Sequence, residues 1–324
     1  MQIEAREEVW PLKETFRISR GSRTETQVVV ATVSNGQCSG RGEGVPIRRY
    51  NQTSESVLAQ IATVKRERNL DRQKLQELLP AGAARNAIDC ALWDLEAKRS
   101  SKRVWELAGI PIVDHVQTAF TISLGSPEKM AAAAKAHSNL PILKLKLGGD
   151  DADFARVEAV RAAVPTARII IDANESWSPA HFREVSPMLA KLGVQLIEQP
   201  FPADSDEILE TLDHPIPVCT DESCHTAEDL PHLKNRYEMI NVKLDKTGGL
   251  TEALRLCERA RANGFKLLIG CMVGTSLSMA PARILASAAD YVDLDGPLLL
   301  SRDRDHGIRY EAGKVDLPPR KLWG

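Results

Sequence analysis

Short apolar runs recur along the second part of the chain, and each is followed by a longer stretch in which apolar residues have helical spacing. Eight of these runs end near Thr121, Lys146, Asp172, Glu198, Asp221, Lys243, Gly270 and Asp293. From Lys146 to Lys243 the intervals are 26, 26, 23 and 22 residues, close to the length of one strand plus one crossover helix. Eight parallel strands joined in this way form a closed barrel, so the pattern predicts an α/β chain whose strand ends meet at one face.

The first part of the chain has a different pattern. Apolar and polar residues alternate up to about residue 33, and Asn35 with Gly36 is a hairpin-turn signal, which predicts antiparallel strands. From about residue 54 to 107 the spacing is helical, until glycine and proline interrupt it near 109–111. We therefore expect an α+β capping domain over residues 1–112 and a (β/α) barrel over residues 113–300. The last segment, 301–324, is expected to return to the capping domain.

Composition narrows the classes of partner and compartment. The 324 residues include 42 basic and 44 acidic side chains, so the net charge of −2 favours neither a nucleic-acid nor a membrane partner. No apolar run is long enough to span a bilayer, and the first residues lack the apolar core of a signal peptide, so we expect a cytoplasmic protein. The six cysteines include no Cys-x-x-Cys pair, which is typical of reduced thiols.

Three successive strand ends carry carboxylates, namely Asp172, Glu198 and Asp221. Oxygen ligands without histidine or cysteine favour Mg²⁺ over zinc or copper. The alternative is that each acid caps the helix that follows its strand. That alternative suits any one of the three better than it suits all three in succession, so the sequence predicts a site for one Mg²⁺.

Lysines flank these carboxylates. Lys144 and Lys146 are two residues apart, so in a strand both side chains point to one face. Taken alone, this is also the pattern of an amphipathic edge strand. In a barrel the lysine face points either into the lumen or onto the helices, where the charges would be buried without partners. In the lumen, two ammonium groups near a cation should lower each other's pKa and allow a lysine to act as a base. Lys243, four strands further on, lies on the opposite wall and could address the other face of a bound carbon.

Several motifs together resemble the enolase superfamily, muconate-lactonising subgroup. They are the helix Ala87–Leu95, the Lys-x-Lys strand, Asp172-Ala173-Asn174, Glu198-Gln199-Pro200, Asp221-Glu222-Ser223 and Asn241–Gly249. The resemblance covers essentially the whole chain and implies a modified TIM barrel, (β/α)7β, with an α+β N-terminal capping domain. Within the subgroup, Asp293-Leu294-Asp295-Gly296-Pro297 resembles the dipeptide epimerases, most closely those of the L-Ala-D/L-Glu type.

The resemblance also implies a role for individual residues. Lys146 and Lys243 would be the acid/base pair, with Asp172, Glu198 and Asp221 as magnesium ligands. Five further residues would touch the substrate: Lys144 its carboxylate, Asp293 and Asp295 its free ammonium, and Thr121 and Cys271 other parts. Arg20, in a mobile loop over 19–23 of the capping domain, would bind the glutamate side chain, and Arg23 is an alternative for that role. Lys246 is expected to lie past the strand end.

Other interpretations stay open at this point. The arginines could be exposed loop charges, and the Asp293/Asp295 pair could be a solvated strand end or a helix cap. An N-acylamino acid racemase, o-succinylbenzoate synthase or cycloisomerase would share the metal and the lysines. A non-catalytic binding protein of the same fold is a more remote alternative.

We expect a Mg²⁺-dependent isomerase that epimerises L-Ala-L-Glu or L-Ala-D-Glu at the second residue. The route would be a two-base 1,1-proton transfer through an enediolate. The enzyme would act on its small dipeptide in murein peptide recycling, and the sequence is compatible with a homo-oligomer.

Overall fold

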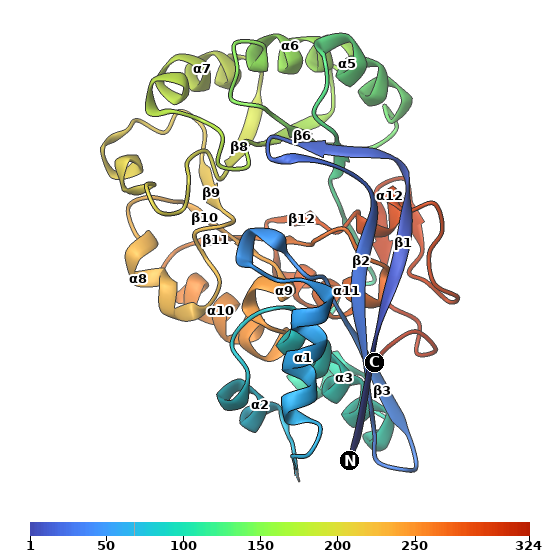
Figure 1. Ribbon diagram of the computed structural model, residues 1–324. Helices are drawn as coiled ribbons and strands as arrows, with labels where there is room; N and C mark the ends of the chain where they lie inside the picture. Colours follow the sequence, from blue (N-terminus) through green and yellow to red (C-terminus); the bar gives the residue numbers. More distant parts are fainter. Residues whose placement is uncertain (68) are drawn as a thin grey trace.

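A computed structural model describes residues 1–67 and 69–324 and contains a nearly closed barrel of eight parallel strands (Figure 1). The strands are β5 (Phe120–Ile122), β6 (Ile142–Lys146), β7 (Arg168–Asp172), β8 (Val194–Glu198), β9 (Val218–Thr220), β10 (Met239–Val242), β11 (Lys266–Gly270) and β12 (Tyr291–Asp293). They lie in the sheet in chain order. Between the two outer strands, the N–H of Ala119 donates to the carbonyl of Val292 at 2.8 Å. The predicted barrel and the predicted strand ends are thereby confirmed.

Helices cover the outside of the barrel, because the crossovers carry the helical periods seen in the sequence. They are α5 (Pro127–Ala136), α6 (Asp153–Ala163), α7 (Pro179–Lys191), α8 (Leu230–Leu233), α9 (Leu244–Thr247), α10 (Leu250–Ala262), α11 (Ser276–Leu285) and α12 (Gly296–Leu299). Short 3-10 helices are η2 (Glu207–Thr211), η3 (Ala227–Asp229) and η4 (Ala286–Ala288). The crossover after β8 therefore departs from the regular repeat, since a 3-10 helix stands where the other early crossovers have an α-helix. None of the described helices is long and apolar enough to cross a membrane.

The apolar stretch around residues 116–121, expected as one strand, is divided between two sheets. β4 (His115–Gln117) pairs with the C-terminal hairpin of β13 (Tyr310–Glu311) and β14 (Lys314–Asp316), whereas β5 belongs to the barrel. At the junction, the Thr118 N–H donates to Gly313 and the Thr118 hydroxyl accepts the N–H of Leu294 at 2.8 Å. Side-chain and backbone bonds at one residue thus let the chain change sheets, which an apolar pattern alone does not reveal.

The N-terminal part is a three-stranded antiparallel sheet backed by helices. Its strands are β1 (Gln2–Ile18), β2 (Gly21–Ser34) and β3 (Ser39–Gly44), and its helices are η1 (Arg48–Tyr50), α1 (Ser54–Val64), α2 (Arg72–Leu78), α3 (Ala83–Ser100) and α4 (Val104–Ala108). Helix α3 lies directly on β3. A Cβ on Gly40, Gly42 or Gly44 would come within 2.1 to 2.2 Å of α3 carbonyl oxygens, so glycine permits this close approach.

The chain returns to this N-terminal part after the barrel. The Trp323 indole N–H donates to the Cys90 carbonyl at 3.0 Å, and the Gly324 N–H donates to Asp94 at 2.8 Å. Both acceptors lie on α3. Trp323 is fully buried in an apolar core that α3 shares with the barrel strands, so the two parts of the chain are packed as one body.

The β1–β2 hairpin extends from the cap to the open end of the barrel (Figure 1, blue). Its register shifts between Pro11 and Phe16, and its turn contains only residues 19 and 20, since Ile18 pairs with Gly21. The loop expected over 19–23 is therefore shorter than predicted, because residues 21–23 belong to β2. Two hydrogen bonds join the hairpin to the barrel loops. The Arg17 carbonyl accepts the Leu124 N–H at 3.0 Å, and the Thr26 hydroxyl donates to the Val273 carbonyl at 2.8 Å.

Candidate active site

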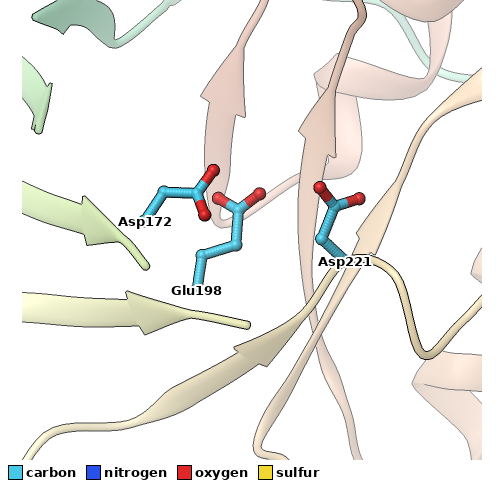
Figure 2. A group of neighbouring side chains, drawn as sticks. All are labelled: Asp172, Glu198 and Asp221. Carbon is cyan, nitrogen blue, oxygen red and sulfur yellow. The ribbon is translucent and has the colours of Figure 1, made fainter. Parts of the chain in front are cut away.

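Three carboxylates meet at the carboxyl ends of adjacent barrel strands. Asp172 and Glu198 are the last residues of β7 and β8, and Asp221 directly follows β9. All three are buried, and their potential ligand atoms lie within 4.8 Å of one another. Figure 2 shows the carboxylate groups gathered around a common space. The interval between the apolar runs thus brings the three predicted ligands together.

The donor set fits a hard divalent cation. Octahedral coordination with Mg–O bonds of about 2.1 Å places ligand oxygens roughly 3 to 4 Å apart, so only a small contraction of this cluster is needed. Glu198 Oε2 and Asp221 Oδ1 are buried and accept no hydrogen bond from the described residues. Their contacts are ion pairs, with Lys144 at 2.7 Å and with Lys246 at 2.8 Å, so both oxygens lie where positive charge is favoured.

The three carboxylates do not cap helices, so that alternative is wrong. Helix α7, which follows Asp172, is capped by Ser178. Asp172 Oδ1 instead accepts the N–H of Asn174 within its own loop at 2.9 Å. After Asp221, the next helical turn has Thr226 as its N-cap residue, and Asp229 accepts the Thr226 N–H at 2.8 Å. The acids are therefore free to face the barrel axis.

Lys144 lies at the centre of the carboxylates. Its ammonium is 2.7 Å from Glu198 Oε2 and 2.7 Å from Asp293 Oδ2, and 3.4 Å from Asp172. The contact with Glu198 is an ion pair without hydrogen-bond alignment, whereas the contact with Asp293 is a hydrogen bond. Because β6 lies between β5 and β7 and the lysine is buried, the amphipathic edge-strand alternative is wrong.

The other two lysines lie on opposite walls. Strands β6 and β10 are four positions apart in the eight-stranded sheet, and Lys243 directly follows β10. Lys146 Nζ is 2.5 Å from Asp172 Oδ2, and Lys243 Nζ is 2.6 Å from Asp221 Oδ2. Each lysine is thus paired with a different carboxylate of the cluster.

The protein groups alone raise the pKa values of Lys144 and Lys243, so the lowered lysine pKa expected beside a cation would need the cation's own charge. Burial acts to lower the pKa of each, but the surrounding carboxylates outweigh it and hold both pKa values above the ordinary range. For Lys144 the strongest of these partners is Asp293, and for Lys243 it is Asp221. The direction of each lysine's pKa shift depends on charged groups from several strands. The residues next to the lysine in its own strand do not reveal those groups.

Two residues that the sequence did not assign hold Asp221 in place. Lys246 lies past β10 in α9 as expected, but its buried ammonium reaches back to the Asp221 carbonyl and is 2.8 Å from Asp221 Oδ1. The side-chain oxygen of Gln199 accepts the Asp221 N–H at 2.7 Å, and its amide nitrogen donates to Phe201 and Ser223. The available signal was the place of Gln199 directly after Glu198, but its side-chain direction requires the structure.

Glu198, at the end of β8, is held by Asn241 of β10. The Asn241 amide donates to Glu198 Oε1 at 2.8 Å. A Cβ on Gly270 would lie 2.5 Å from Asn241 Oδ1, so glycine at the end of β11 leaves room for the asparagine. The glycine noted at this strand end is therefore required by the packing around the carboxylate.

The residues expected at the substrate ammonium lie beside this cluster. Asp293 ends β12, and Asp295 precedes α12 and accepts the Thr121 N–H at 2.6 Å. Burial, followed by the charge of Asp293, raises the pKa of Asp295 to about 7. Burial, followed by the charges of Asp293 and Asp295, raises the pKa of Cys271 well above its ordinary value, so its thiol is neutral. Asp293 Oδ1 accepts no hydrogen bond from the described residues and is open to a donor.

Arg20 is bound to the barrel. Its guanidinium donates to the Asn174 carbonyl at 2.8 Å, to Glu175 at 3.0 Å and to Glu222 at 2.5 Å. Burial, then the charge of Asp221, raises the pKa of Glu222 to about 8, while Arg20 acts in the opposite direction. The Arg20 guanidinium is therefore already occupied by protein acceptors.

Arg23 differs from Arg20. It lies in β2 opposite Phe16, with its guanidinium 5.6 Å from the centre of that ring. Among the described residues it makes no ion pair or hydrogen bond through its side chain. Arg23 is an exposed residue, but the atoms packed around its guanidinium lower its pKa by desolvation, and the partner with the opposite effect is Cys271 at the barrel end. Of the two arginines, Arg23 is the one whose side-chain donors all lack a partner among the described residues, whereas Arg20 donates to three protein acceptors.

Comparison with known families gives two matches that together span most of the chain. The N-terminal domain model of mandelate racemase/muconate lactonizing enzyme matches residues 1–109. The enolase C-terminal domain-like model matches residues 128–321.

Two curated relatives cover nearly the full chain. The L-Ala-D/L-Glu epimerase of Escherichia coli (strain K12) is 46% identical over 96% of this chain and 98% of its own length. An N-acetyl-D-glutamate racemase from a Pseudoalteromonas species is 44% identical over 92% of this chain and 95% of its own.

Solved structures agree closely with this fold. An enolase family member from Agrobacterium tumefaciens with homology to dipeptide epimerases, with bound sodium, L-Ala-L-Glu and an ordered loop, has a TM-score of 0.97. It is 48% identical and covers 99% of both chains. The dipeptide epimerase of Enterococcus faecalis V583, complexed with Mg and L-Leu-L-Tyr, has a TM-score of 0.91 at 29% identity, with 98% and 96% of the two chains covered.

Proposed function

Because this chain belongs to the mandelate racemase/muconate lactonizing enzyme family of the enolase superfamily, we propose that its barrel-end site is a Mg²⁺-dependent dipeptide epimerase of the L-Ala-D/L-Glu type. The observation that carries the proposal is the pair of buried lysines, Lys146 and Lys243, on opposite walls of a cluster of three converging carboxylates. The relatives that support it are an L-Ala-D/L-Glu epimerase and a structure with bound L-Ala-L-Glu.

The two lysines would move the proton. One lysine, in its neutral form, removes the α-proton of the second residue from one face, and the other ammonium returns a proton from the opposite face. Asp172, Glu198 and Asp221 would hold the metal. When bound, Mg²⁺ would supply positive charge at the substrate carboxylate and draw the three protein carboxylates away from the lysine ammonium groups. Lys144 would orient the substrate carboxylate from the centre of the cluster.

The two ends of the dipeptide would be recognised by different elements. Asp293 and Asp295 suit the free ammonium, because one is buried with an open oxygen and the other lies beside Thr121 and Cys271. For the glutamate side chain we propose Arg23 in place of Arg20, since both terminal nitrogens of Arg20 are engaged by protein acceptors, two of them carboxylates. This choice selects between the two arginines that the sequence left open.

A second candidate is racemisation of an N-acylated glutamate. It is favoured by the N-acetyl-D-glutamate racemase that is 44% identical to this chain. An N-acyl substrate has no free ammonium, so it would leave Asp295 and the open Oδ1 of Asp293 without a substrate cation, and only Asp293 Oδ2 would keep its ion pair with Lys144. The dipeptide is therefore the first choice. The synthase and cycloisomerase alternatives have no such supporting observation.

The experiment that separates these candidates is proton exchange in D₂O. The protein, loaded with Mg²⁺, is incubated with L-Ala-L-Glu, other dipeptides, N-acetyl-L-glutamate and N-succinyl amino acids. Mass spectrometry then measures how many deuterons each compound has gained. We expect one deuteron in L-Ala-L-Glu and in its epimer. Uptake restricted to the N-acylated compounds would refute the dipeptide assignment, and no uptake in any compound would favour the binding-protein alternative.

We also propose a cytoplasmic enzyme that acts in murein peptide recycling. The compartment is supported by six free cysteines, since unpaired thiols are typical of reducing surroundings. The pathway is supported by the relative that acts on L-Ala-D/L-Glu. Loss of growth on that dipeptide after gene disruption would test this role.

A further inference from the structure

We propose that Arg20, Arg49, Glu175 and Glu222 form a clasp that holds the β1–β2 turn closed on the barrel, and that Arg20 is a positioning residue in it. The four side chains come from two cap segments and from the loops after β7 and β9. The consequence for the substrate rests on the proposed function, but the clasp itself does not.

Glu175 is the anchor of the clasp. Its two oxygens accept a forked pair of hydrogen bonds from Arg49, at 2.8 and 2.9 Å, and the Ala203 N–H at 2.9 Å. The Oε2 atom also accepts from Arg20 at 3.0 Å. The carboxylate thus joins two separate segments of the cap to one barrel loop. Forked guanidinium–carboxylate bonds are directional, so they fix position as well as charge.

The backbone at this loop is arranged to receive the turn. Asn174 and Glu175 have φ values of 46° and 64°, in the left-handed region that non-glycine residues rarely adopt. In this conformation the Asn174 carbonyl accepts both the Ser19 hydroxyl, at 3.1 Å, and Arg20, at 2.8 Å. Strain of this kind persists only where surrounding contacts hold it. Here the Asn174 N–H is held by Asp172 and the Glu175 N–H by the Gln199 carbonyl, and the turn adds its two bonds to the Asn174 carbonyl.

Glu222 is the second point of attachment. Its side chain is only 3% exposed, and Oε1 accepts from Arg20 at 2.5 Å while Oε2 has no partner among the described residues. Burial of a carboxyl group with half of its acceptors unused is costly. The cost is understandable if the group serves to bind Arg20. Glu222 directly follows Asp221, so the turn is tied to the same loop that carries a metal ligand.

The clasp leaves the neighbouring strand position free. Arg23, three residues after Arg20, has no hydrogen-bonded partner for its side chain among the described residues, and Cys271 influences its guanidinium. On the other side of the hairpin, Arg17 is held by the loop after β5. With the turn fixed on one side and Arg17 on the other, the guanidinium of Arg23 is kept beside the Phe16 ring, within electrostatic reach of Cys271 at the barrel end. The division of labour is that Arg20 positions and Arg23 binds.

Tryptic cleavage at the turn tests the clasp directly, because trypsin cuts after Arg20 and Arg23. Glu175→Gln keeps both cleavage sites and the shape of the side chain but removes the charge. We expect cleavage of the native Mg²⁺-loaded protein at these two positions to become about tenfold faster, since proteolysis follows the population of the open form. The matched control is Glu311→Gln, which removes the same charge from the exposed pair with Arg309.

A second variant protects the test against a folding defect. Arg20→Lys keeps a tryptic site and a positive charge, but an ammonium cannot hold the forked set of three acceptors. Arg20→Lys should therefore also make tryptic cleavage at the turn faster. If both variants are cleaved at the rate of the native protein and of the control, the clasp is refuted. Magnesium affinity, measured by calorimetry, should stay within twofold in Glu175→Gln.

Kinetics separate the clasp from the proposed function. If Arg20 positions Arg23, kcat/KM should fall several-fold more for L-Ala-L-Glu than for L-Ala-L-Gln in both variants, mainly through KM. Equal losses for the two dipeptides would refute the positioning role. Faster cleavage in a protein that turns over neither dipeptide would uphold the clasp and refute the proposed function.

Discussion

The site has two sides that are held together differently. On the barrel side, the carboxylates and lysines stand at or next to strand ends, so the hydrogen-bonded register of the sheet fixes their relative places. On the cap side, a two-residue turn is fixed by ion pairs to distant loops. The barrel side resembles a rigid frame, whereas the cap side depends on a few side chains. Changes to chemistry should therefore arise on the first side and changes to substrate preference on the second.

The largest expected effect comes from removing a proposed base on the barrel side. Lys146→Ala and Lys243→Ala should each reduce epimerisation by about 10³-fold or more, because acid/base catalysis is lost on one face. One variant should still exchange the α-proton of a single epimer. Chiral chromatography of the products in D₂O measures both quantities, with the exposed Lys266→Ala as control. Full turnover in both variants would contradict the two-base assignment.

On the cap side, Arg23→Gln should act on substrate preference. Loss of a charged hydrogen bond to the substrate carboxylate is expected to lower kcat/KM for L-Ala-L-Glu by about 100-fold at most. L-Ala-L-Gln should be affected much less, and magnesium affinity should not change. Steady-state kinetics with the two dipeptides measures the ratio. An equal loss for both would place Arg23 outside the substrate contacts.

A third change tests how firmly the frame holds its ligand. Lys246→Met removes the ammonium that contacts the Asp221 carbonyl and carboxylate. Loss of such a supporting contact should weaken magnesium binding by about tenfold. Calorimetric titration with MgCl₂ gives the affinity, and Lys234→Met, at an exposed position, is the control. Unchanged affinity in a folded variant would make Lys246 a purely structural residue.

The last prediction concerns stability at the junction between the two sides, where α3 packs on the barrel. Burial raises the pKa of Asp89 to about 6 and that of Asp245 to about 7. A carboxyl group with a raised folded-state pKa stabilises the fold fully below its unfolded value, near pH 4, and the stabilisation is lost as pH rises through the folded value. The free energy of unfolding should therefore fall between pH 4 and pH 7, by up to about 1.4 kcal/mol per pH unit for each group.

Urea unfolding of the metal-free protein at several pH values measures this slope. Asp245→Asn should flatten the slope between pH 5 and pH 7, because the amide still accepts from Val45 and Asn86 but does not titrate. Asp305→Asn, at an exposed position, should leave the slope unchanged. A slope of the opposite sign would mean that these carboxyls are not the groups that decide it.

The two sides also differ in how far sequence reasoning reaches. The barrel and the meeting of Asp172, Glu198 and Asp221 follow from one repeated interval, because each period ends at the same face. The direction of the lysine pKa shifts does not follow, since it depends on carboxylates from several strands. Nor does the function of Lys246, whose place past the strand end was foreseen but whose return to Asp221 was not.

On the cap side, the sequence placed Arg20 and Arg23 in one loop, and the structure gives them different conformations. A turn of two residues and a strand from Gly21 onward put Arg20 and Arg23 in different surroundings. Partners such as Glu175 and Glu222 lie more than 150 residues away in the chain, at 155 and 202 positions from Arg20. No local pattern specifies contacts of that separation.

The contact of Trp323 with Cys90 has a further consequence for how the molecule folds. The two residues are 233 positions apart, and both belong to a core that includes strands of the cap and of the barrel. During synthesis, helix α3 leaves the ribosome long before the residues that cover it. Such non-local closure makes folding slow, and the uncovered face is then open to aggregation. The last few residues of the chain thus decide when the first domain becomes complete.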